Sequence, residues 1–92
     1  MSEILITRKH HLSARKAKQA AEQVATDLQN EFNLDYAWDD EGVLHFERTG
    51  LHGELTLSKG EATIQVRLGF LLSAFRGSLE REIHRYFDER FV

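Results

Sequence analysis

Apolar and polar residues follow two different periods along this chain, and the change between them predicts the order of its elements. Alternation with period two, typical of a strand with one buried face, occurs in short runs between turn residues. Spacing of three and four, typical of a helix with one buried stripe, occurs in two longer segments. The predicted strands cover residues 3–8, 34–38, 43–48, 54–58 and 61–68, one helix covers residues 14–32, and a second helix closes the chain.

The first helix has recognisable ends. Ser13 precedes it and is a good N-cap, because its hydroxyl can accept a hydrogen bond from a first-turn N–H that has no partner inside the helix. Asn33 follows as the helix end. The apolar positions expected to form one buried stripe are Ala14, Ala17, Ala21, Val24, Ala25, Leu28 and Phe32.

Turn residues divide the middle of the chain into short strands. Gly42 ends one turn, Thr49–Gly53 form the next connection and Lys59–Gly60 form the third. Such runs are typical of an antiparallel meander with one wet face. The predicted fold is α+β in two layers: strand, helix, four-stranded antiparallel meander, helix, with both helices packed on one face of the sheet. We expect the first strand at an edge, beside the fifth.

The most apolar stretch, Leu68–Gly77, lies where the strand pattern gives way to the helix pattern. The strand phase predicts that Phe70 and Leu72 point inward and Leu71 outward, which leaves Leu71 and Phe75 without a place in the core. One interpretation is a packed strand-to-helix corner. The other is a semi-exposed apolar patch that meets a partner surface. The candidate contact residues are Phe70, Leu71, Leu72 and Phe75.

The start of the last helix depends on how this stretch bends. If the helix begins near Leu71, Gly77 lies inside it at a cost of about 1 kcal/mol relative to alanine. If it begins after Gly77, Ser78 is the N-cap and acidic residues follow in the first turn. We favour the later start, with residues 70–77 as a bent lead-in.

Composition narrows the function classes. The chain has 92 residues, which we treat as a single domain, residues 1–92, and it contains no cysteine. Its five histidines show no zinc-ligand spacing, and no nucleophile elbow or phosphate-binding glycine loop occurs. We therefore expect no enzyme, no metal and no cofactor. With no apolar run long enough for a membrane span and no secretory signal, we expect a cytoplasmic protein.

The charges are unevenly distributed around a net charge of −3. A basic segment near the start of the sequence is followed by an acidic middle segment. Such an uneven distribution of charge could orient the protein on a charged partner. The alternative is a solvated surface whose charges pair locally. Five basic residues without stacking aromatics are too few to indicate nucleic-acid binding. The residues of this possible anion contact are Arg8, Lys9, Arg15, Lys16 and Lys18.

The chain carries several short motifs: Ile4-x-Ile6-x-Arg8-x-His10, the alanine-rich helix, Phe46-Glu47-Arg48-Thr49-Gly50 with Gly53, and Leu68-Gly69-Phe70-Leu71-Leu72 followed by Leu79-Glu80-x-Glu82-Ile83. Together with the length, these motifs resemble the polyhydroxyalkanoic acid system family of small bacterial proteins, encoded in gene clusters for storage-polyester synthesis and use. The resemblance spans nearly the whole chain.

The resemblance implies an accessory role in polyhydroxyalkanoate metabolism, at the granule or in its regulation, and it supplies no catalytic residues. The expected partner is the granule surface or a granule-linked protein. Two alternatives stay open: a small helix-grip-like binder of an acyl or other hydrophobic ligand, and a cytoplasmic protein–protein interaction module. A homodimer is also left open.

Overall fold

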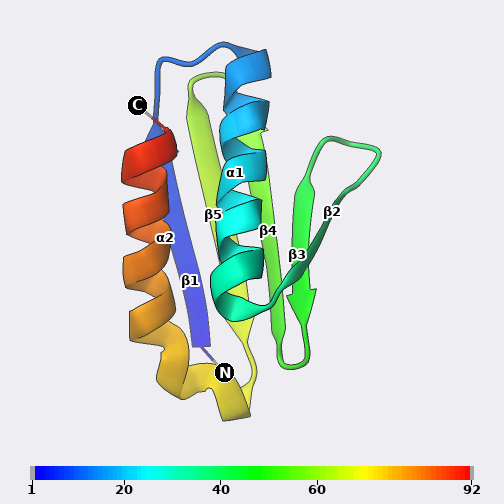
Figure 1. Cartoon of the computed structure of the whole chain (residues 1–92), viewed down its shortest axis with the longest axis vertical. Coiled ribbons are helices and arrows are strands. Elements are labelled where there is room, and N and C mark those ends of the chain that lie inside the picture. Colours follow the sequence, from blue (N-terminus) through cyan, green and yellow to red (C-terminus); the bar gives the residue numbers. More distant parts are fainter. Residues whose placement is uncertain (1, 92) are drawn as a thin grey trace.

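A computed structural model of the chain describes residues 2–91. Five strands and two α-helices follow one another in the predicted order, with a short 3₁₀ helix, η1, between the last strand and the last helix (Figure 1). The elements are β1 (Ser2–Lys9), α1 (Ala14–Phe32), β2 (Asp35–Trp38), β3 (Leu44–Arg48), β4 (Leu51–Ser58), β5 (Glu61–Leu68), η1 (Phe70–Phe75) and α2 (Arg76–Arg90).

The five strands form one antiparallel sheet in the order β1-β5-β4-β3-β2. The predicted α+β fold is confirmed, and so is the place of β1 at an edge beside β5. One strand boundary differs by more than a single residue. The strand predicted at residues 54–58 begins at Leu51, because Gly50 has φ +81° and turns the chain at once, so that Arg48 and Leu51 pair directly.

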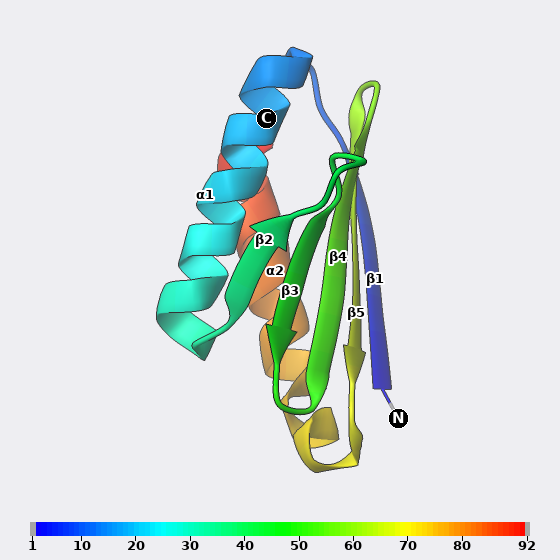
Figure 2. The same ribbon diagram turned by 90° about the vertical axis from the view of Figure 1, so that its right-hand side faces the viewer.

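Both helices cover the same face of the sheet, and the other face is left open (Figures 1 and 2). Alternate residues of the strands point between the layers, where they meet the apolar stripes of the helices. No helix within residues 2–91 has the length and hydropathy that a membrane span requires. The largest fully buried side chains of this core are Phe46, Phe87, Ile4, Leu28, Leu44, Leu55, Ile64, Leu68, Ile83 and Val24.

Helix α1 begins and ends as predicted. The Ser13 hydroxyl accepts a hydrogen bond from the Lys16 N–H at 3.3 Å, and Asn33 adopts the left-handed conformation at the other end. The buried stripe differs from the prediction at three positions, since Ala14 is exposed, Ala20 is buried and Phe32 is only partly buried. Small residues along the stripe let the helix lie close to the sheet.

The start of α2 corrects the prediction. The helix begins at Arg76, so Gly77 lies in its first turn and Ser78 is not the N-cap. The physical reason is the backbone ahead of it. An N-cap side chain needs an extended residue at the helix start, whereas Phe75 (φ −89°, ψ 0°) is helical and η1 leads directly into α2.

Ion pairs hold α2 against α1. The Arg85 guanidinium lies 3.2 Å from the Glu31 carboxylate, and the Arg90 guanidinium lies 3.3 Å from the Asp27 carboxylate. These side chains are partly exposed, so each pair contributes modestly to stability. Their effect is mainly geometric, because they set the position of α2 relative to the end of α1.

We expect Gly50→Ala to destabilise the protein more than Gly42→Ala does. Both glycines have a positive φ, +81° and +82°, where an alanine costs roughly 1–2 kcal/mol. A Cβ at Gly50 would also come within 3.3 Å of the Leu72 side chain, whereas a Cβ at Gly42 would meet no atom within 4 Å. Urea unfolding of both variants measures the difference, and equal losses would contradict the proposed role of the Leu72 contact.

Candidate functional site

Large exposed apolar side chains gather at η1, the corner between β5 and α2. Phe70 and Leu71 are each 84 % exposed, and Phe75 is 57 % exposed, whereas Leu72 packs partly against the core. Of the two interpretations of this stretch, the structure shows the exposed patch for three of the four candidate residues. The inward orientation predicted for Phe70 is wrong, because β5 ends at Leu68 and the alternation stops there.

The geometry of η1 explains which side chains are exposed. A 3₁₀ helix has three residues per turn, so positions 72 and 75 lie on one side and positions 70 and 71 lie on others. Only the side with Leu72 and Phe75 faces the body of the protein. η1 itself projects at the lower end of the molecule in both ribbon views (Figures 1 and 2). Phe70 and Leu71 therefore point into solvent.

Backbone contacts attach this corner firmly to the sheet. The Gly69 N–H donates to the Gly50 carbonyl at 2.8 Å, and the Leu72 N–H donates to the Gly69 carbonyl at 3.1 Å. The Leu72 side chain lies over Gly50, where a Cβ would be only 3.3 Å from its Cδ1 atom. The Ser73 hydroxyl closes the turn by donating to the Phe70 carbonyl at 2.9 Å. The apolar patch is thus presented by an anchored turn.

A pocket of about 450 Å³ lies beside this patch. Its walls come from the end of α1, the β3–β4 turn region, the end of β5, η1 and the first turn of α2. Most of the lining is aliphatic or aromatic, and the polar groups are few, as is typical of pockets for small ligands. The lining residues are Glu31, Phe32, Asn33, Arg48, Leu51, Leu68, Leu72, Phe75, Ser78 and Leu79.

Arg48 is the cation of this pocket, and it was not among the predicted site residues. Its Nη1 donates to the Phe32 carbonyl at 2.8 Å, at the end of α1. The sequence carries a signal for it, because Leu44, Phe46 and Arg48 share one strand phase and the first two are buried. An arginine at the last inward-facing position of a strand lies at the edge of the core, with its guanidinium free to reach solvent.

Glu31 is the acidic residue of the pocket, and it shares one cation with two other carboxylates. The Arg85 guanidinium pairs with Glu31 at 3.2 Å and also with Glu82 and Glu89. The hydrogen bond to Glu82 raises the pKa of the Arg85 guanidinium above its usual value, so this cation stays charged. The Arg48 guanidinium, in contrast, has no carboxylate partner. Among residues 2–91 no carboxylate lies within ion-pair distance of it.

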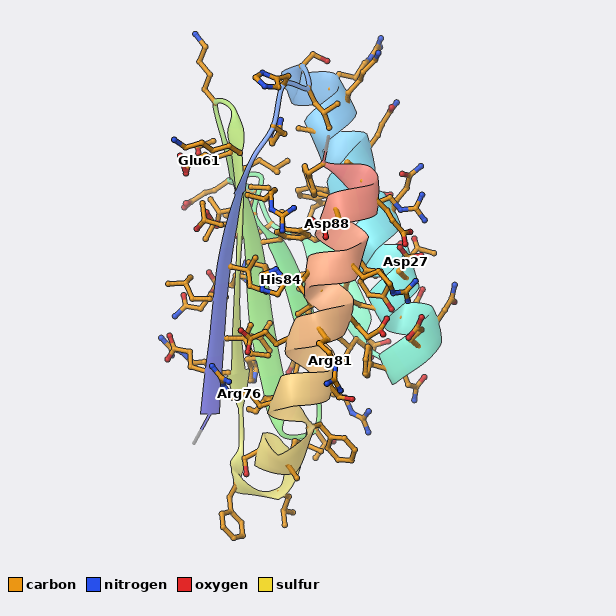
Figure 3. All side chains as sticks on the ribbon, turned by 90° about the vertical axis from the view of Figure 1, so that its left-hand side faces the viewer. Asp27, Glu61, Arg76, Arg81, His84 and Asp88 are labelled. Atoms are coloured by element: carbon orange, nitrogen blue, oxygen red, sulfur yellow. The ribbon has the colours of Figure 1, made fainter. Side chains whose placement is uncertain are left out.

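The structure does not bring the predicted basic residues into one cluster. Arg8 forms an ion pair with Asp88 of α2, and Figure 3 shows Asp88 and His84 on the side of α2 beside β1. Lys18 lies over the Trp38 ring, with Nζ 5.1 Å from the ring centroid. Lys9 stays on β1, whereas Arg15 and Lys16 are exposed in the first turn of α1. Anion contact by these five residues stays a prediction.

The histidines are dispersed as well. His10 is buried against Phe91, and its Nδ1 accepts a hydrogen bond from the Leu12 N–H at 3.1 Å. His45 lies on the open face of the sheet, with Nε2 2.7 Å from the Asp39 carboxylate. Within residues 2–91 no three His, Asp or Glu side chains are grouped closely enough to hold a metal ion. That the protein binds no metal and is no enzyme stays a prediction.

Asp39 has the most elaborate polar surroundings on this open face. Its Oδ1 accepts hydrogen bonds from the Glu41 N–H at 2.8 Å and the Val43 N–H at 2.9 Å, while Oδ2 contacts His45. The His45 hydrogen bond, with help from these backbone donors, lowers the pKa of the Asp39 carboxyl below its usual value. This arrangement organises the β2–β3 turn, which lies at the opposite end of β3 from Arg48 of the pocket.

Comparison with known protein families identifies one match, which covers nearly the whole chain. The family described as "Putative polyhydroxyalkanoic acid system protein" matches residues 4–91. No curated protein and no solved structure matches the chain. The resemblance inferred from the sequence motifs is therefore confirmed at the level of the family.

The Asp39 hydrogen bonds predict a pH dependence that Asp39→Asn should remove. Since folding lowers the pKa of Asp39, its ionised form stabilises the native state at pH values above the pKa of the unfolded chain, which is about 3.9. This contribution is lost as pH falls from there through the lower native pKa. Urea unfolding between pH 7 and pH 2.5 measures the effect. The free energy of unfolding should be higher for the wild type than for the variant at neutral pH, and the difference should shrink in acid. A difference that stays constant with pH would contradict the lowered pKa of Asp39.

Proposed function

The chain belongs to the polyhydroxyalkanoic acid system family, and from this premise we propose that it is a non-enzymatic accessory protein that attaches to the surface of polyhydroxyalkanoate granules through η1. The cytoplasm, where such granules form, is its proposed location. The observation that carries the proposal is the exposure of Phe70, Leu71 and Phe75 on one anchored turn.

The chemistry of the two surfaces matches. A storage polyester offers an apolar surface, and the exposed side chains of η1 would leave water on contact with it. Burying each side chain is worth roughly 1.5–3 kcal/mol as an upper bound. After the costs of association, three such side chains support attachment on the order of micromolar affinity. This strength suits reversible residence at a granule.

The rest of the described surface favours η1 as the point of contact. Within residues 2–91, Leu5 is the other large apolar side chain that is strongly exposed, at 66 %. It lies on the open face of the sheet between Glu3 and Thr7, opposite Gln65 of β5. A single leucine among polar neighbours is an ordinary surface feature, whereas clustered apolar side chains indicate a binding surface.

Replacing both Phe70 and Leu71 by serine should abolish most granule binding without unfolding the protein. Neither side chain is buried, so the loss of stability should be under about 1 kcal/mol. The loss of their burial should weaken binding by at least about tenfold. Co-sedimentation of the purified protein with polyhydroxyalkanoate particles over a range of protein concentrations measures the effect.

Leu5→Ser is the matched control, because it removes another strongly exposed apolar side chain from a different face. Its binding should equal that of the wild type. Equal losses in both variants would show nonspecific adsorption and reject η1 as the contact. A wild type that stays in the supernatant would reject granule attachment itself.

A further inference from the structure

We infer that the pocket between η1, the end of α1 and the β3–β4 turn binds an aliphatic carboxylate, with the chain among the apolar walls and the carboxylate on the Arg48 guanidinium. This is a second binding site, which shares Phe75 with the proposed granule contact but does not include Phe70 or Leu71. The inference rests on the proposed function only for the source of the ligand, since a polyhydroxyalkanoate chain ends in a free carboxyl group.

The size and walls of the pocket suit an alkyl chain. Its volume of about 450 Å³ falls within the range of roughly 300–1,000 Å³ for small-molecule sites. Leu51, Leu68 and Leu79 are buried side chains that form its inner wall, and Leu72 and Phe75 form the side toward η1. Such a wall gains free energy by excluding water from a methylene chain and offers no specific partner to a polar ligand.

The charge of the pocket selects the head group. Arg48 is exposed and lines the pocket, so its guanidinium lies where an alkyl chain inside would meet solvent. One of its nitrogens donates to the Phe32 carbonyl, and the remaining N–H groups can donate to a carboxylate. The Glu31 carboxylate is engaged by Arg85, which also pairs with Glu82 and Glu89, whereas the Arg48 guanidinium has no carboxylate partner among residues 2–91. A carboxylate is the complementary group.

Its place beside an apolar wall distinguishes Arg48 from the other arginines. Arg8, Arg76, Arg85 and Arg90 each pair with a carboxylate of the chain itself. Arg15, Arg67 and Arg81 have no ion pair among residues 2–91, but they do not line this pocket. Arg48 is held by a neutral carbonyl. An arginine fixed in this way, next to an apolar wall and without its own counter-charge, is preorganised for an anionic ligand with an apolar tail.

The experiment is an NMR titration of the isotope-labelled protein with octanoate at pH 7, with 1-octanol as the probe that lacks the carboxylate. Octanoate is ionised at this pH. Amide shifts are expected around Leu51, Leu72 and Leu79, together with a shift of the Arg48 side-chain N–H. Octanol should bind at least about tenfold more weakly, because it forms no charge-assisted hydrogen bond.

Four variants test the assignment of the residues. Arg48→Gln should weaken octanoate binding by at least about tenfold and leave octanol binding unchanged, and Arg48→Lys should recover part of the loss. Arg81→Gln, an exposed arginine of α2 without an ion pair among residues 2–91, is the matched control and should bind as the wild type does (Figure 3). Ser78→Phe, at an exposed lining position, should fill the pocket and abolish binding of both probes.

The outcomes separate this inference from granule attachment. Octanoate shifts absent from the pocket residues, equal binding of octanol, or normal octanoate binding by Ser78→Phe would overturn the inference. The test with Ser78→Phe stays valid even if Arg48→Gln disturbs folding by removing the hydrogen bond from Arg48 to the Phe32 carbonyl. The double serine variant at Phe70 and Leu71 should bind octanoate normally, so a failure of granule attachment leaves the pocket measurable.

Competition identifies the source of the ligand. A short hydroxyalkanoate oligomer with a free carboxyl end should displace octanoate if the pocket takes the end of a polyester chain, and the same oligomer as its methyl ester should not. Displacement by the monomeric hydroxy acid alone would assign the pocket to a soluble acid. Displacement by the ester as effectively as by the acid would overturn the role of the carboxylate.

Discussion

The close approach of two glycines is the constraint on which the functional end of this protein depends. The Gly69 N–H donates to the Gly50 carbonyl, and Leu72 packs over the Gly50 Cα where no side chain intervenes. This contact ties the start of η1 to the β3–β4 turn. Because the turn of the chain is fixed there, Leu72 and Phe75 face the pocket while Phe70 and Leu71 face solvent.

The second constraint is that both helices share one face of the sheet. With the core on that face, α1 and α2 must lie side by side, and the pairs Glu31–Arg85 and Asp27–Arg90 link them at the surface. The space left where α1 ends and α2 begins becomes the pocket. Its position therefore follows from the layer arrangement, while its charge follows from Arg48, the last inward-facing residue of β3.

The two proposed activities meet at η1. One side of this short helix offers apolar side chains to a surface, and the other side closes a pocket that suits an alkyl chain with an acidic end. A protein of this kind could rest on a storage polyester and hold a chain end or a free acid close to the same surface. The chain belongs to the polyhydroxyalkanoic acid system family, and both proposals start from that membership.

Most of the fold could be predicted from the sequence, because the period of its apolar residues reports local backbone structure. Ser13 and Asn33 marked the ends of α1, and the alternation in Ala62, Ile64, Val66 and Leu68 marked β5 and its buried face. Local turn chemistry also predicted the meander. The motifs were sufficient to identify the family, since they are spread over nearly the whole chain.

The candidate site could be predicted only in part. Leu71 and Phe75 were recognised as side chains without a place in the core, whereas Phe70 was expected to point inward. Whether each side chain is buried depends on residues about twenty positions away along the chain. The pocket and its Arg48 were missed, because six separate elements form its walls. Sequence period alone determined the elements and their buried faces. Only the tertiary structure decided which side chains meet water, since that depends on what distant segments cover.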